Sequence, residues 1–158
     1  MAEQRATFAA GCFWCVQQSF DSLKGVKSTV VGYMGGITEN PTYKDVCSHK
    51  TGHAEVVDVV FDPDQISYGQ LVDFFFTVHD PTTLNRQGPD VGDQYRSSIF
   101  YYTPEQKTAA ETAKQRAQAS GRFKRPIVTE IVPAKPFWRA EEYHQKYNEK
   151  RALTSCHT

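Results

Sequence analysis

The sequence predicts an α+β fold, a two-layer sandwich in which helices pack against one mixed sheet. Three observations support this prediction. The chain has 158 residues, of which 39% are hydrophobic, and this is enough to bury a core without disulfides. Strand and helix patterns follow one another in the order β-α-β, loop, β-α, loop, β-α-β-α, which is typical of mixed two-layer folds. Neither a repeat nor a low-complexity linker divides the chain, so we expect a single domain over residues 1–158.

The amino-terminal part predicts a strand, a tight turn and a helix, followed by a second strand. Residues 7–10 form a short apolar run that ends at Gly11, and residues 12–23 carry apolar side chains at spacings of three and four. Residues 29–34 have the β-branched and aromatic content of a strand, which ends at two glycines. We expect a helical turn over residues 42–47.

The central part contains the segment with the clearest strand pattern. Residues 54–61 are rich in valine, and the Asp-Pro pair that follows ends the strand. Residues 66–78 place their apolar and aromatic side chains on one broad stripe, which predicts a helix packed on the core. Residues 82–92 hold turn-forming residues without periodicity and predict a loop, and residues 98–102 predict a short aromatic strand.

The carboxyl-terminal part predicts a helix, a strand and a last helix. Thr103 is a suitable N-cap, Pro104 fits the first helical position, and Gln106 predicts a capping box. Alanines recur every four residues along this helix until a Ser-Gly pair ends it. Residues 127–132 resume a β pattern, and we expect the last helix over residues 137–150.

Composition excludes several classes of partner. The chain has 18 basic and 18 acidic residues, so its formal net charge of zero creates no field that would attract nucleic acid or acidic membranes. No apolar run approaches the roughly 20 residues needed to span a bilayer. The polar residues 1–7 match neither a signal peptide nor a transit sequence. We therefore expect a cytoplasmic protein without nucleic-acid or membrane partners.

Cysteine usage indicates redox or metal chemistry. The chain has four cysteines, at residues 12, 15, 47 and 156, and a reducing compartment would keep them as thiols unless they react. Cys12 lies where a strand turns into a helix, so free backbone N–H groups and the helix dipole should favour its thiolate. Phe13 and Trp14 follow it and can form an apolar pocket for a methyl or thioether group. These residues predict a nucleophile beside an aromatic wall.

Several separated motifs carry a resemblance to a known family. Gly-Cys-Phe-Trp at residues 11–14 is accompanied, in order, by motifs at residues 32–36, 40–43, 51–55, 79–81, 92–97 and 140–145. Together they resemble the A-type peptide methionine sulfoxide reductases from residue 7 to about residue 147. The resemblance implies a two-layer α/β sandwich with a ferredoxin-like plait core and an irregular carboxyl-terminal tail. It also implies reduction of the S epimer of methionine sulfoxide, either free or in proteins.

The resemblance assigns roles that the residue chemistry can fulfil. Cys12 would attack the sulfoxide sulfur and become a sulfenic acid, while Glu55 would protonate the oxygen. Glu55 has apolar sequence neighbours, and desolvation would raise its pKa and keep it protonated. Tyr43 and Tyr95 would donate hydrogen bonds to the oxygen, with Asp90 in the same polar network. Phe13 and Trp14 would receive the ε-methyl group of the substrate.

Turnover then requires a second thiol. The resemblance favours Cys156, because relatives often carry a resolving cysteine near the carboxyl terminus, and Cys15 is the alternative because it forms a C-x-x-C with Cys12. Cys47 is interpreted as a structural thiol. At Gln17 many relatives have glutamate. The implied reductant is thioredoxin, with no bound cofactor and no metal.

Two other functions compete with this interpretation. A general thiol-disulfide oxidoreductase could use Cys12 and Cys15, although nothing else in the chain resembles that family. A non-enzymatic zinc-binding module could use Cys12, Cys15, Cys47 and His49, although structural zinc is mostly needed by domains with smaller cores.

Overall fold

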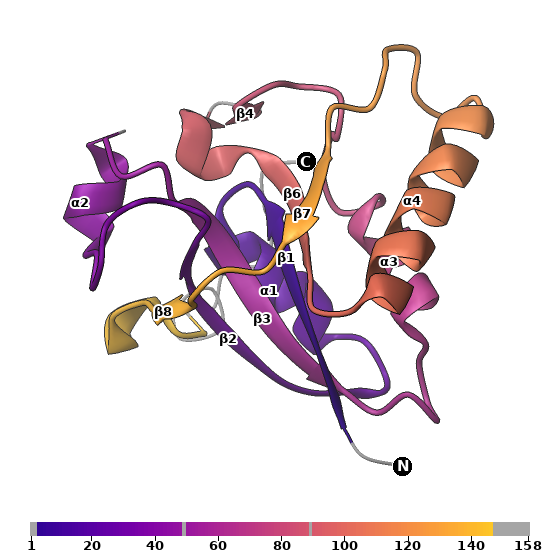
Figure 1. Cartoon of the computed structure of the whole chain (residues 1–158), viewed down its shortest axis with the longest axis horizontal. Coiled ribbons are helices and arrows are strands. Elements are labelled where there is room, and N and C mark those ends of the chain that lie inside the picture. Colours follow the sequence, from indigo (N-terminus) through magenta and orange to yellow (C-terminus); the bar gives the residue numbers. More distant parts are fainter. Residues whose placement is uncertain (1–2, 49, 89, 147–158) are drawn as a thin grey trace.

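The structure of the protein is a computed structural model that describes residues 3–48, 50–88 and 90–146. Within these residues the main sheet has six strands in the order β7-β6-β1-β3-β2-β8 (Figure 1). The strands are β1 (Gln4–Ala10), β2 (Val26–Met34), β3 (Ala54–Phe61), β6 (Ser97–Tyr101), β7 (Glu130–Pro133) and β8 (Trp138–Arg139). Neighbouring strands are antiparallel except for β6 and β7, which are parallel. The predicted mixed sheet is confirmed.

Three helices share one hydrophobic core with the sheet: α1 (Phe13–Asp21), α3 (Tyr68–Phe75) and α4 (Pro104–Ala119). Successive side chains of a strand point to opposite faces. In β3, Val57, Val59 and Phe61 pack in the core under these helices. Glu55 has the same parity along the strand and therefore faces the helix side as well. The α+β class is confirmed.

Stacked aromatic rings and small residues hold this layer together. Phe8 of β1 stacks against Phe20 of α1 at 5.2 Å and against Phe75 of α3 at 5.3 Å between ring centroids. All three side chains are fully buried, and each such burial contributes about 1.5–3 kcal/mol. Two of the alanines whose four-residue spacing predicted α4, Ala113 and Ala117, lie on its buried face together with Ala110, whereas Ala109 is only partly buried. These small side chains let α4 pack closely on its neighbours.

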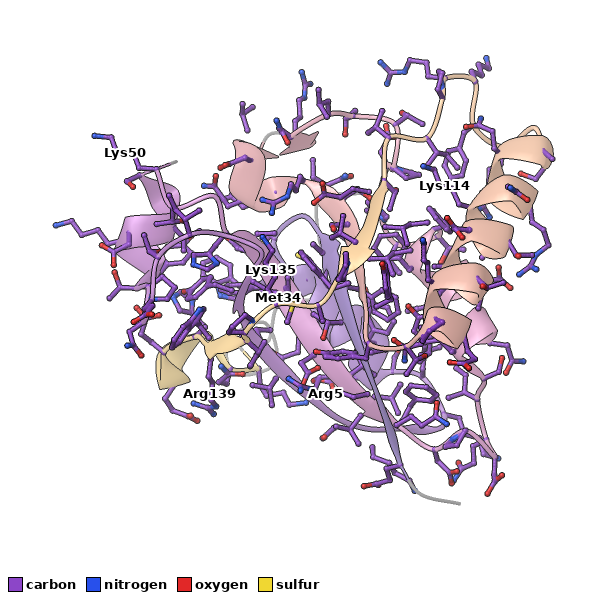
Figure 2. All side chains as sticks on the ribbon, in the orientation of Figure 1. Arg5, Met34, Lys50, Lys114, Lys135 and Arg139 are labelled. Carbon is purple, nitrogen blue, oxygen red and sulfur yellow. The ribbon has the colours of Figure 1, made fainter. Side chains whose placement is uncertain are left out.

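A smaller core covers the opposite face of the sheet. Met34 at the end of β2 packs there with Val56 of β3 and Phe100 of β6 (Figure 2). Phe137 packs on this cluster from the segment that joins β7 to β8 and crosses the sheet in Figure 1. The segment therefore replaces the helices as the cover of this face.

The predicted helix over residues 137–150 is wrong for the part that the structure describes. This segment forms β8 and a short 3-10 turn, η2 (Glu142–His144), and residues 147–150 lie outside the described residues. The reason is edge pairing: Trp138 is the register partner of Tyr33 in β2. The approach is so close that a Cβ on Gly32 would lie 2.4 Å from the Trp138 carbonyl oxygen. These tertiary contacts override the local helix propensity.

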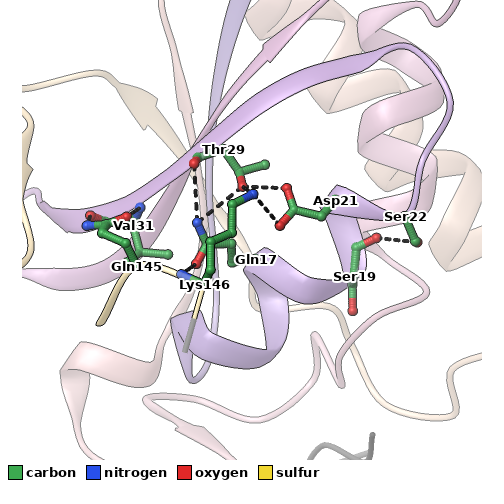
Figure 3. Close-up of polar contacts among 8 residues, drawn as sticks. All are labelled: Gln17, Ser19, Asp21, Ser22, Thr29, Val31, Gln145 and Lys146. Carbon is green, nitrogen blue, oxygen red and sulfur yellow. Dashed lines mark hydrogen bonds and ion pairs between the residues drawn. The ribbon is translucent and has the colours of Figure 1, made fainter. Parts of the chain in front are cut away.

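Two glutamines dock the following residues onto α1 and β2 (Figure 3). Gln145 accepts the Val31 N–H at 3.0 Å and donates to the Val31 carbonyl at 3.0 Å, as a neighbouring strand would. Gln17 of α1 donates to the carbonyl of Thr29 at 3.2 Å and accepts the Lys146 N–H at 2.7 Å. Lys146 also pairs with Asp21 at 2.6 Å. Residues 145 and 146 are thus fixed beside α1 and β2.

Two smaller expectations also need correction. Residues 82–92, predicted as a loop, contain two short paired strands, β4 (Arg86–Gln87) and β5 (Asp90–Val91). Strands of two residues are too short to produce a recognisable sequence pattern. Thr103 caps α4 by accepting the Gln106 N–H at 3.1 Å, as predicted. The Gln106 side chain, however, accepts from the N–H of Tyr102 rather than from that of Thr103, so the predicted capping box is not formed.

Within the described residues, no helix combines the length and apolar character needed to cross a bilayer. The irregular carboxyl-terminal tail of the prediction falls on residues 147–158, outside the described residues.

Candidate active site

The thiol of Cys12 lies at the junction of β1 and α1. β1 ends at Ala10, and Gly11 then adopts φ +95°, a conformation that other residues rarely adopt. Cys12 is the N-cap of α1, and the main-chain N–H groups of Trp14 and Cys15 lie close enough to lower the pKa of its thiol, although its side chain makes no cap hydrogen bond. The predicted strand, turn and helix are therefore confirmed, with the sulfur at the helix start.

Burial keeps this thiol neutral in the free protein. Desolvation, with a smaller contribution from the charge of Glu55, raises the pKa of Cys12 to about 12. The two N–H groups act in the opposite direction but are outweighed. The predicted effect of the helix start on the thiol is thus present, and burial outweighs it.

Glu55 is a buried carboxyl group beside the thiol. Its side chain is 1% exposed, and Oε1 accepts the main-chain N–H of Phe13 at 3.2 Å. Oε2 has no hydrogen-bond partner among the described residues. Burial, with a smaller effect from Asp90, raises the pKa of Glu55 to about 8 despite the bond from Phe13. The predicted desolvation is confirmed, and at neutral pH the group carries its proton.

Aromatic rings form a wall over the start of α1. Phe13 and Trp14 lie 6.5 Å apart between ring centroids, and Tyr43 lies 6.3 Å and 6.2 Å from them. The imidazole of His144 packs against all three rings, and its centroid lies 4.4 Å from that of Tyr43. The predicted pairing of Phe13 and Trp14 is thus part of a larger cluster. Sequence analysis missed His144, whose only signal was its place in the motif at residues 140–145.

Glu141 fixes the position of Tyr43. Tyr43 begins α2 (Tyr43–Cys47), a short helix with a capping box formed by Thr42 and Asp45. Glu141 accepts the Tyr43 N–H and the Tyr33 hydroxyl, both at 3.1 Å. Burial acts to raise the pKa of Glu141, but hydrogen bonds, including these two, outweigh it and lower the pKa. An ionised carboxylate therefore joins β2 to α2.

Two phenols and one carboxylate complete the polar side of the site. Burial and the charge of Glu55 raise the pKa of both Tyr43 and Tyr95, so both remain hydrogen-bond donors. Tyr95 is held by the short turn η1 (Asp93–Tyr95), which contacts β3. Asp90 in β5 is close enough for its charge to raise the pKa of Cys12, Glu55 and Tyr95. The structure thus brings together the predicted catalytic residues from five elements.

The other cysteines differ in state. Cys47 is a partly buried free thiol in α2, and the nearby Tyr43 side chain acts to lower its pKa against the larger effect of burial. Cys15 is disulfide-bonded, whereas Cys12 is free, so these two are not bonded to each other. Cys156 and His49 lie outside the described residues. Within the described residues, no group of three or more His, Cys, Asp or Glu side chains could hold a metal ion.

A free thiol with a protonated carboxyl group and phenolic donors defines a thiol-based oxidoreductase. The family model described as Peptide methionine sulfoxide reductase matches residues 4–158. The chain therefore belongs to the peptide methionine sulfoxide reductase family.

Known relatives cover nearly the whole chain. A peptide methionine sulfoxide reductase MsrA from Acidobacterium capsulatum is 60% identical over 153 residues, which are 97% of this chain and 98% of the relative. Reduced Mxr1 from Saccharomyces cerevisiae is similar with a TM-score of 0.92 and 36% identity, covering 98% of this chain and 89% of Mxr1. Mxr1 in complex with Trx2 is similar with a TM-score of 0.66 and 26% identity, covering 99% and 87%.

Proposed function

We propose that this protein reduces the S epimer of methionine sulfoxide, free or within proteins, through Cys12. Its family supplies the reaction class. The observation that carries the residue assignment is the buried Oε2 atom of Glu55, which lacks a partner among the described residues on a carboxyl group that is protonated at neutral pH. A proton donor with no competing acceptor is what a sulfoxide oxygen requires.

The reaction balances without an external proton. The Cys12 sulfur attacks the sulfoxide sulfur while Glu55 donates its proton to the oxygen. The S–O bond of the substrate breaks and the oxygen passes to Cys12, which becomes a sulfenic acid as the thioether leaves. The substrate sulfur gains two electrons and the Cys12 sulfur loses two. The proton of the Cys12 thiol restores the acid form of Glu55.

The two sides of the site divide the work of binding. Tyr43 and Tyr95 donate hydrogen bonds to the oxygen, and Asp90 acts on both Tyr95 and Glu55 through its charge. Phe13 and Trp14 receive the methyl group on the apolar side. An oxygen that must reach the phenols and a methyl group that must reach the indole together favour one epimer at sulfur.

We further propose that Cys156 resolves the sulfenic acid by forming a disulfide with Cys12, with Cys15 as the alternative once its own disulfide is reduced. Thioredoxin would then reopen the disulfide, a proposal that the complex of Mxr1 with Trx2 supports. No bound cofactor is required by these steps. The cytoplasmic location and a single catalytic domain over residues 1–158 stay predictions. The order β6-β1-β3-β2 supports the proposed ferredoxin-like plait core.

One experiment tests the proposal against the general thiol-disulfide oxidoreductase. The purified protein is first fully reduced, because Cys15 is disulfide-bonded in the structure, and the reductant is removed. It then receives one equivalent of methionine S-sulfoxide, and the products are identified by mass spectrometry. We expect one methionine per protein and a Cys12 to Cys156 disulfide, with a Cys12 to Cys15 disulfide as the alternative. Cys12→Ser should release no methionine, whereas full activity in that variant would overturn the proposal. If Cys15→Ser abolishes activity while Cys156→Ser retains it, the result would favour the general oxidoreductase.

A further inference from the structure

A buried histidine, His144, accepts a hydrogen bond from the indole of Trp14. Trp14 Nε1–H donates to Nδ1 of His144 at 2.9 Å, across 130 positions of sequence. His144 is 1% exposed, and η2 carries it on the segment that β8 attaches to the edge of β2. The indole has one N–H donor, so this bond fixes which way the ring plane faces.

The imidazole also packs on the other members of the wall. Its ring centroid lies 5.6 Å from Trp14, 5.3 Å from Phe13 and 4.4 Å from Tyr43. Burial lowers the pKa of His144, against a smaller opposing effect from Glu141, so the ring stays neutral and Nδ1 stays available as an acceptor. One side chain therefore sets both the angle of the indole and its distance from Tyr43.

We propose that His144 is a positioning residue that determines specificity for a methyl group, because it fixes the Trp14 indole as one wall of the substrate pocket. This inference rests on the proposed role of Trp14 in receiving the methyl group. His144 itself does not touch the reacting atoms. Without its acceptor, the indole can turn about its side-chain torsions, and the pocket loses the width that suits one carbon.

The test compares a methyl with an ethyl substrate in a double-mutant cycle. The kcat/KM values for methionine S-sulfoxide and ethionine S-sulfoxide are measured in the wild type, His144→Phe, Trp14→Phe and the double variant. His144→Phe keeps an aromatic ring but removes the acceptor. We expect it to lower the methyl-to-ethyl preference about tenfold, mainly through KM for the methyl substrate. In the Trp14→Phe background the same change should have no effect, since the N–H donor is already absent.

A second variant protects the test against misfolding of His144→Phe. Replacing Trp14 by β-(3-benzothienyl)alanine keeps the bicyclic shape and removes only the N–H donor, and it should lower the preference to the same degree. Glu142→Gln is the matched control, because Glu142 lies in η2 and pairs with Arg139 at the exposed surface. Its preference should equal that of the wild type.

Two results would overturn the inference. One is an unchanged methyl-to-ethyl preference in both His144→Phe and the benzothienyl variant. The other is an equal loss from His144→Phe with and without Trp14, which would reveal a general structural role. Both results presuppose a wild type that reduces methionine S-sulfoxide. A wild type without that activity would instead contradict the proposed function.

Discussion

Glu55 accepts the main-chain N–H of Phe13, and this contact ties the acid of the site to the first residue of α1. Phe13 directly follows Cys12, so one hydrogen bond fixes the carboxyl group relative to the thiol. Only Oε1 is used, and Oε2 remains for the substrate. The geometry separates two tasks of one carboxyl group, anchoring and proton donation.

Glu55→Gln should abolish proton donation and leave the anchor intact. The amide oxygen of Gln can accept the Phe13 N–H, but the side chain cannot release a proton to the sulfoxide. We expect the rate of methionine formation in a single turnover to fall by about 10²–10⁴. The thermal midpoint at pH 6 should stay close to that of the wild type, since both side chains are neutral there. Unchanged kinetics would remove Glu55 from the mechanism.

The raised pKa of Glu55 also predicts how stability depends on pH. The carboxyl group titrates near its ordinary value of 4.5 in the unfolded chain and at about 8 in the folded protein. Between these values the folded state holds a proton that the unfolded state has lost, so stability falls as pH rises from 4.5 to about 8 and then levels off. Urea unfolding across this range measures the slope. Glu55→Gln should remove this contribution, and an identical slope in both proteins would contradict the assignment.

Sequence pattern predicted most of the fold because most elements carry their own signal. Residues 54–61 are rich in valine and were predicted at the bounds of β3. The segment from residue 137 failed because its conformation is set by Tyr33 and Gly32 of β2, which lie about a hundred residues away. The same reason hid His144, since its role depends on Trp14. Cys12 and Glu55 were found because they lie in motifs, and only the structure could reveal that burial outweighs the helix start at Cys12.

If Tyr43 and Tyr95 each donate a hydrogen bond to the oxygen, the effects of removing the two hydroxyl groups should be additive in activation free energy. We expect Tyr43→Phe and Tyr95→Phe each to lower kcat about tenfold and the double variant about a hundredfold. Tyr101→Phe is the control, because Tyr101 lies at the end of β6 and has no role in the site. Steady-state rates with thioredoxin as reductant provide the measurement. A double variant no slower than either single variant would show that the phenols act as one unit.

Gln17→Glu should destabilise this protein because the side chain both donates and accepts hydrogen bonds. The amide of Gln17 donates to the Thr29 carbonyl at 3.2 Å and accepts the Lys146 N–H at 2.7 Å (Figure 3). A carboxylate can accept from Lys146, but it cannot donate to Thr29. A lost donor at a buried acceptor costs about 1–3 kcal/mol.

A protonated glutamic acid regains one donor, so the cost of Gln17→Glu should shrink as pH falls toward 4. Urea unfolding at pH 7 and pH 4.5 measures this difference. Gln115→Glu on the exposed face of α4 is the control for added charge, and its effect should stay within about 0.5 kcal/mol. Equal stability of Gln17→Glu and the wild type at pH 7 would mean that the Thr29 carbonyl finds another donor. In that case the contacts of Gln145 with Val31 and the pair of Lys146 with Asp21 would be enough to hold residues 145 and 146 in place.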